Sequence, residues 1–114
     1  PKEHGFEKWD NFPHERDRLL SLLTAYKNII IVSGDRHAGE ISTMKNGKNR
    51  LVEITASGIN RNSTLKSEKN KYRVGERLLE SNFGQIEIDW KRKSLNIALI
   101  DITGKKITNQ MINF

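Results

Sequence analysis

The residues of this chain that could do chemistry gather in the segment 33–37, which contains Ser-Gly-Asp-Arg-His. Asp35 and His37 alternate around Arg36, so in an extended conformation both side chains would point to one side. A carboxylate and an imidazole on one face suit a cation such as iron, manganese or zinc, and a carboxylate also suits calcium. Further ligands would have to come from elsewhere. The alternative is that Asp35 caps a turn and His37 is a hydrogen-bonded, partly buried histidine.

The elements before this segment predict a helix and then a strand. Apolar residues recur at helical spacing from Pro13 to Tyr26, so we expect a helix there, with Asp10 or Asn11 capping its start. The run Ile-Ile-Ile-Val at 29–32 is apolar on both faces and predicts a buried central strand. The Gly-Asp-Arg-His segment follows directly, so it lies at the strand's carboxyl end, where ligands bind in open α/β sheets.

The rest of the chain predicts strands that are mostly antiparallel. Residues 41–44 and 50–55 flank an Asn-Gly pair, which indicates a hairpin with a connection longer than two residues. Residues 57–82 are expected to form a long loop with one helical turn around 76–79. Alternating apolar residues predict further strands at 83–90, 95–102 and 106–112. The fold class is therefore α/β.

Length and composition indicate one small folded domain, residues 1–114, with 35% hydrophobic and 30% charged residues. The absence of cysteine excludes disulfides and thiolate metal sites. No apolar run approaches the roughly 20 residues of a membrane-spanning helix, so we expect no membrane span. Aromatic residues are expected in the core or at its edge, and two histidines are expected at the surface. These residues are Trp9, Phe12 and Trp90, and His4 and His14.

The net charge of +6 leaves a second function open. A basic β-rich module without catalytic activity could bind nucleic acid or another acidic partner. The basic residues are scattered, however, with local enrichment at 66–77 and at 91–93, where a hairpin turn is expected. Attraction of phosphate-bearing substrates is an equally good use of this charge, and we do not favour specific nucleic-acid binding.

Several short pieces of the sequence occur together in a specific order. They are Trp-Asp-Asn-Phe-Pro-His-Glu-Arg at 9–16, Arg-Leu-Leu at 18–20, Ile-Val-Ser-Gly-Asp-Arg-His at 31–37, Glu40, Glu-Ile-Thr-Ala-Ser-Gly at 53–58, Arg-Val-Gly at 73–75 and Asn-Phe-Gly-Gln-Ile-Glu-Ile-Asp-Trp at 82–90. In these pieces the chain resembles the C-terminal part of the PhoD-like (alkaline phosphatase D) phosphatases, a branch of the calcineurin-like metallophosphoesterases. The resemblance covers nearly the whole chain.

The resemblance implies that Asp35 and His37 are ligands in a binuclear metal centre. The wider superfamily has Gly-His-x-His at this place, and Asp35 in the position of the first histidine favours iron or calcium over two late transition metals. The implied activity is hydrolysis of phosphomonoesters or phosphodiesters by a metal-activated water. The implied fold is the C-terminal portion of a layered α/β/β/α sandwich, with one main helix packed on a mostly antiparallel sheet.

Other motifs of the superfamily do not occur in these 114 residues. They are Asp-x-His, Gly-Asp-x-x-Asp and Gly-Asn-His-Asp/Glu. The resemblance therefore implies that an N-terminal half of the same domain supplies the other ligands, and that this chain alone is inactive and exposes the surface that half would cover. Because family members are often exported, a periplasmic or extracellular location would follow from the resemblance alone. A degenerate family member retained as a scaffold is a third alternative.

Other residues are weaker candidates for the site. Arg36 could bind a substrate phosphate through two hydrogen bonds, although we favour a structural salt bridge that points away from the metals. Ser57, Asn60 and Arg61 border the long loop and could line a substrate cleft. Glu40 could orient the histidine as a hydrogen-bond partner, although a position on the sheet surface is favoured.

Overall fold

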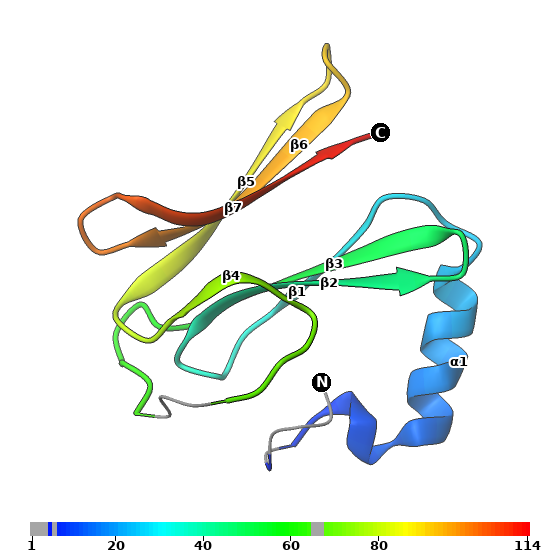
Figure 1. The fold of residues 1–114 in the computed structure, drawn as a ribbon, viewed down its shortest axis with the longest axis horizontal. Helices are drawn as coiled ribbons and strands as arrows, with labels where there is room; N and C mark the ends of the chain where they lie inside the picture. Colours follow the sequence, from blue (N-terminus) through cyan, green and yellow to red (C-terminus); the bar gives the residue numbers. More distant parts are fainter. Residues whose placement is uncertain (1–4, 6, 65–67) are drawn as a thin grey trace.

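The structure is a computed structural model that describes residue 5 and residues 7–64 and 68–114. The described residues form a short 3-10 helix η1 (Trp9–Asn11), one α-helix and seven β-strands (Figure 1). These elements are α1 (Pro13–Leu23), β1 (Ile29–Ser33), β2 (Gly39–Asn46), β3 (Asn49–Ala56), β4 (Arg73–Leu78), β5 (Asn82–Asp89), β6 (Ser94–Asp101) and β7 (Lys106–Asn113). Within the described residues, no helix is long and apolar enough to cross a membrane.

The strands form two sheets that pack face to face around one core. The first sheet has the order β1-β3-β2-β4 and the second has the order β5-β6-β7. Only β1 and β3 pair in parallel, and the other pairs are antiparallel. The predictions of a mixed α/β chain and of mostly antiparallel strands are therefore confirmed. The core between the sheets consists of Ile41, Val52 and Ile54 from the first and Leu95, Ile97 and Leu99 from the second.

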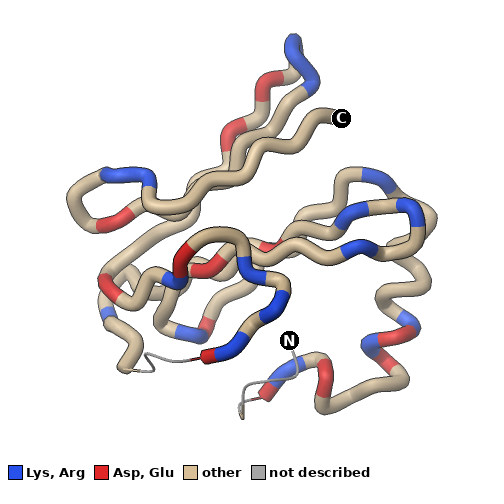
Figure 2. Tube along the Cα trace, viewed as in Figure 1, with Lys and Arg blue, Asp and Glu red and all other residues tan. Residues whose placement is uncertain are grey.

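The connections confirm some predictions and correct others. The basic cluster 91–93 occupies the turn between β5 and β6, as predicted (Figure 2). The hairpin of β2 and β3 was expected to have a longer connection, but Asn46 pairs with Asn49 and only Gly47 and Lys48 lie between them. Gly47 has a φ of 61°, and a glycine at the first position of a two-residue turn allows this tight geometry.

The helical turn predicted around 76–79 is wrong, because residues 76–78 belong to β4 and residue 79 follows that strand. That strand pairs antiparallel with β2 at the edge of the first sheet. Gly75 interrupts its alternation with a φ of 68°, and a Cβ at this position would lie 2.9 Å from side-chain atoms of Thr108 in β7. The glycine therefore allows the two sheets to approach closely and hides the strand pattern in the sequence.

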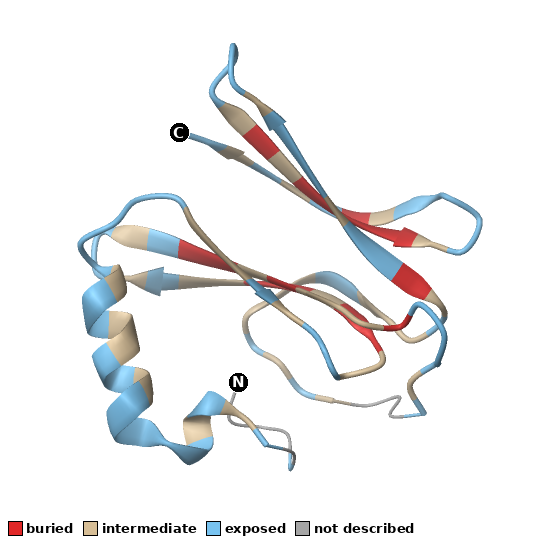
Figure 3. Cartoon of the chain, turned by 180° about the vertical axis from the view of Figure 1, so that it is seen from behind, coloured by how far each residue is buried: buried red, intermediate tan, exposed pale blue. Residues whose placement is uncertain are grey.

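The predicted buried central strand is a strand, but it lies at the edge of the first sheet. β1 pairs with β3 only. In the second sheet β5 contacts β3 and β7 contacts β4, so these two strands lie mainly over the rest of the first sheet. Of the described residues of β1, Ile30 packs against the inter-sheet core. Val32, in contrast, is 69% exposed (Figure 3). Ile86 and Ile88 of β5 are exposed along the same side of the sandwich. We call Val32, Ile86 and Ile88, with the edges of β1 and β5, the open side.

The helix α1 is held mainly at the tip of the β2–β3 hairpin, which corrects the expectation of a helix packed on the sheet. None of its residues is buried. The Asn46 side-chain amide donates a hydrogen bond of 2.8 Å to the carbonyl of Leu20. The Asn49 amide donates to the carbonyls of Thr24 and Tyr26, also at 2.8 Å. These bonds attach the C-terminal end of the helix, which stops at Leu23 and not at Tyr26.

The helix begins at Pro13, as predicted, but the expected side-chain cap is absent among the described residues. Phe12 is at the N-cap position and no side chain caps the helix there. Asp10 instead forms an ion pair of 3.1 Å with Arg16. Trp9 and Phe12 are exposed, so they are not core residues, because α1 and η1 stand away from the inter-sheet core.

Trp90 is also exposed and was wrongly expected in the core. It lies at the turn after β5, and its ring packs edge-on against Phe114 with 6.0 Å between the centroids. His14 is exposed, as predicted. The prediction for His4 lies outside the described residues.

Candidate functional site

The segment that follows β1 is bent, not extended. Asp35 has a φ of 66° and His37 a φ of 50°, so both non-glycine residues are in the left-handed region. The reason lies in the strand order: β3 separates β1 from β2, so the chain must cross the end of β3 to reach Gly39. The expectation that Asp35 and His37 share a side through extended alternation is therefore wrong. Left-handed non-glycine residues cost of order 1 kcal/mol or more each.

Asp35 is exposed and His37 is half-buried in this turn, at the carboxyl end of β1. Because β1 and β3 are parallel, β3 ends at the same edge. Ser57 follows β3, and its backbone N–H donates a 3.3 Å hydrogen bond to the carbonyl of Ala38. A Cβ on Gly34 would lie 3.7 Å from the Ser57 Cβ, so the turn packs against this serine. The Ser57 Oγ is buried without a hydrogen-bond partner among the described residues.

The other two residues of the long loop that were expected to line a cleft, Asn60 and Arg61, are exposed. None of the described side-chain hydrogen bonds or ion pairs joins them to the turn at 34–37. Ser57 therefore contacts the turn, whereas none of the described polar contacts joins Asn60 or Arg61 to it. Their substrate-binding role stays a prediction.

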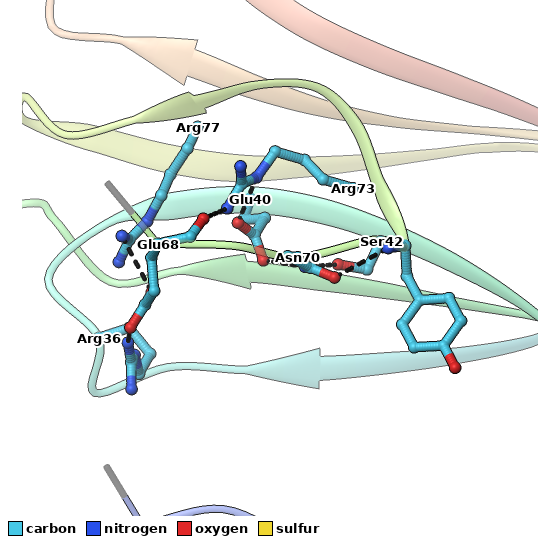
Figure 4. Close-up of polar contacts among 8 residues, drawn as sticks. Arg36, Glu40, Ser42, Glu68, Asn70, Arg73 and Arg77 are labelled. Atoms are coloured by element: carbon cyan, nitrogen blue, oxygen red, sulfur yellow. Dashed lines mark hydrogen bonds and ion pairs between the residues drawn. The ribbon is translucent and has the colours of Figure 1, made fainter. Parts of the chain in front are cut away.

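Arg36 forms an ion pair with Glu68, as the favoured alternative predicted (Figure 4). Arg77 binds the other oxygen of the same carboxylate, with 2.9 Å between Nη1 and Oε2. All three side chains are largely buried, and the single negative charge of the carboxylate lies between the two positive guanidinium groups. A phosphate would have to compete with Glu68 for Arg36.

Glu40 belongs to a neighbouring polar cluster on the first sheet. The Arg73 Nε donates to its Oε2 at 2.6 Å, and the Asn70 amide donates to its other oxygen (Figure 4). The Asn70 amide also donates to Ser42 Oγ at 2.8 Å. No hydrogen bond among the described residues joins Glu40 to His37. Glu40 is thus a residue of the sheet surface, and its cluster holds the segment before β4 on the first sheet.

Sequence reasoning missed both clusters. Glu68 and Asn70 lie in a stretch that was expected to be an unstructured loop. The partners are 32 residues apart for Arg36 and Glu68 and 33 residues apart for Glu40 and Arg73. Patterns of residue spacing in the sequence do not predict contacts between residues this far apart. The only available signal was that Glu40 and the Arg-Val-Gly piece at 73–75 both belong to the resemblance.

The fit of the turn to a metal centre is partial. A carboxylate and an imidazole are suitable ligands for iron, and the carboxylate for calcium. Within residues 5, 7–64 and 68–114, no three His, Cys, Asp or Glu side chains gather in a way that could hold a metal ion. Asp35 and His37 could thus supply two ligands, and the others would have to come from outside the described residues.

Comparisons with known proteins add no relative. No family model matches the chain, and neither a curated protein nor a solved structure matches it. The likeness to PhoD-like phosphatases therefore rests on the sequence pieces alone.

Proposed function

We propose that this chain is the C-terminal segment of a metal-dependent phosphoesterase similar to the PhoD-like phosphatases. The main support is the turn after β1, where Asp35 and His37 are both left-handed at the carboxyl end of a parallel strand. Backbone strain of this kind clusters at functional sites, and this end of a parallel strand is where ligands bind in α/β folds. Four described non-glycine residues have positive φ: Asn28 before β1, Lys93 in the turn between β5 and β6, and the two that the sequence pieces assign as ligands. Only these two lie together in one turn at the carboxyl end of a parallel strand.

In this proposal the Asp35 carboxylate and the His37 imidazole each hold a metal. The bound metals would supply an acidified water and would neutralise charge on the phosphoryl oxygens. The contribution of the chain itself is positional. The turn packs against Ser57, and the strand order takes it across the end of β3. Iron or calcium, or both, are the proposed metals.

The open side supports the proposal that another half of the same domain completes the site. Edge strands present unpaired N–H and C=O groups, and β1 has no partner on its free edge within the described residues. The apolar side chains of Val32, Ile86 and Ile88 are exposed beside these edges. Exposed apolar patches at strand edges are typical of interaction surfaces. A preceding half that contributes strands to both sheets would cover them.

The decisive experiment uses a longer protein that includes the coding segment upstream of Pro1. We expect that segment to encode Asp-x-His and Gly-Asp-x-x-Asp, and the longer protein to hydrolyse p-nitrophenyl phosphate or bis-p-nitrophenyl phosphate. Asp35→Asn and His37→Gln should each lower kcat about a hundredfold or more, since loss of outer partners of a metal ligand already costs up to that much.

Matched controls are available on α1, where Asp17 and His14 are exposed. Asp17→Asn and His14→Gln make the same chemical changes away from the turn and should leave kcat unchanged. Full activity of Asp35→Asn and His37→Gln would contradict the proposal, as would an upstream segment without the two motifs.

The alternative of a basic binding module finds less support. In the enriched segment 66–77, Arg73 and Arg77 are engaged in ion pairs with carboxylates of the same chain. Lysines and arginines elsewhere are spread over several turns and strands (Figure 2). A steep dependence of nucleic-acid affinity on salt concentration would favour this alternative over the phosphoesterase.

A further inference from the structure

A cavity lies between the helical segment and the face of the first sheet that points away from the second sheet. Its volume is about 350 Å³, within the range of small-molecule sites. Its apolar walls come from two sources: Trp9, Leu19 and Leu20 on the helical side, and Ile31, Met44 and Leu51 on the sheet. Such walls suit the hydrocarbon part of a ligand.

Glu53 lines this cavity from the middle of β3, the strand at the interior of the sheet. It is half-buried, and its neighbours in the register are Ile31 of β1 and Ser42 of β2. Its Oε1 accepts a 2.9 Å hydrogen bond from Ser33 Oγ, which lies 2.7 Å from Thr55 Oγ1. A neutral hydroxyl group, that of Ser33, is thus its one side-chain hydrogen-bond partner in the described part of the chain.

Four other carboxylates line the cavity. Glu7 is exposed, and the other three each have a cationic partner. Asp10 pairs with Arg16 at 3.1 Å, Glu40 with Arg73 at 2.6 Å, and Glu68 with Arg77 at 2.9 Å. Glu53 forms no ion pair with a described lysine or arginine. A partly buried carboxylate without a cation is costly, and a cation that enters the cavity would relieve that cost.

We infer that this cavity binds a small organic cation, with its ammonium group at the Glu53 carboxylate and its apolar part between Leu19 and Ile31. The ring of Trp9 also lines the cavity, and aromatic rings attract cations. The ring of Tyr72 lines it too, but the Lys71 ammonium already lies 5.0 Å from its centroid. The cavity borders the turn of the proposed phosphoesterase site, because Gly34, Arg36 and Glu40 also line it, but neither Asp35 nor His37 does.

The test measures binding of 2-phenylethylammonium to the 114-residue chain by titration calorimetry at low salt, with 2-phenylethanol as the neutral probe. The cation should bind, and the neutral probe should bind about tenfold more weakly or worse, the difference that a hydrogen bond to a charged group makes. Glu53→Gln should weaken binding of the cation to a similar extent. Glu76→Gln removes an exposed carboxylate of β4 outside the cavity and should leave the affinity unchanged.

A second pair of variants tests the location without altering Glu53. Leu19→Trp places a larger side chain in the cavity and should abolish binding. Leu22→Trp, on the exposed face of the same helix, should leave it intact. The inference is overturned if 2-phenylethylammonium does not bind. It is also overturned if 2-phenylethylammonium and 2-phenylethanol bind the wild-type chain with equal affinity and Glu53→Gln changes neither affinity. Equal binding would assign the cavity to an apolar ligand or packing element.

Discussion

The same substitution, valine to alanine, should have very different costs on two neighbouring strands. Val32 in β1 is 69% exposed and Val52 in β3 is 1% exposed. Both side chains lie on the face toward the second sheet. Val52 and Ile54 belong to the core between the sheets, and the register places Val32 beside Ile54. Residue type and the direction of the side chain are thus matched. The cover from the second sheet differs, and so does the position in the sheet, because β1 is an edge strand and β3 is flanked on both sides.

The magnitudes follow from the burial. Val52→Ala removes two buried carbon groups at about 0.8 kcal/mol each and leaves a cavity, so it should cost about 2 to 3 kcal/mol in the free energy of unfolding. Val32 buries about a third of its surface, so the same change loses about 0.5 kcal/mol of transfer energy. The lower strand propensity of alanine adds to this loss, and the total cost of Val32→Ala should stay below about 1 kcal/mol.

Urea unfolding followed by circular dichroism measures both costs in the 114-residue chain. In the longer protein that the proposed function requires, the cost of Val32→Ala should rise to about 2 kcal/mol, because a covering half would bury the side chain. Equal costs of the two variants in the 114-residue chain would show that β1 is already covered. A low cost of Val32→Ala that persists in the longer protein would refute the open side as the interface.

Two further predictions concern the contact of β4 with β7 and the turn between β6 and β7. Gly75→Ala should destabilise the chain more than Gly104→Ala in urea unfolding: both glycines have positive φ, but only at Gly75 would a Cβ meet another side chain, that of Thr108. The Thr103 hydroxyl donates to Asp101 and lowers the pKa of that carboxyl below its ordinary value of 3.8. Thr103→Val should raise this pKa toward 3.8 in an NMR titration. Since a lowered pKa stabilises the fold above pH 3.8, the variant should lose stability there and not well below that pH. An unchanged pKa, or equal costs of the two alanines, would contradict these assignments.

The strands that sequence patterns predicted best are those of the second sheet. Alternation from Phe83 to Trp90 is complete enough to indicate β5, and β6 and β7 follow across short turns. β4 was missed because Gly75 breaks its pattern and no apolar run surrounds it. For β1 the pattern predicted a strand but not its position at the edge of the sheet. A run that is apolar on both faces does not indicate which other strands pair with it or cover it.

The candidate site was predictable only in part, for a related reason. The position of Asp35 and His37 after a strand follows from local sequence. Their left-handed conformation follows from the strand order, which local sequence does not specify. The ion pair of Arg36 with Glu68 joins residues that lie far apart in the chain. Glu53 was part of a resembling piece, but its cavity exists only through the packing of the helical segment beside the sheet.

The central claim is that Asp35 and His37 bind metal. Its most direct test is the metal content of the longer protein, measured by inductively coupled plasma mass spectrometry after dialysis. We expect the wild-type protein to hold a binuclear complement of iron or calcium, or both, and Asp35→Asn and His37→Gln each to lose metal, while Asp17→Asn and His14→Gln keep the full complement. A wild-type protein without metal, or an unchanged complement in both Asp35→Asn and His37→Gln, would contradict the claim.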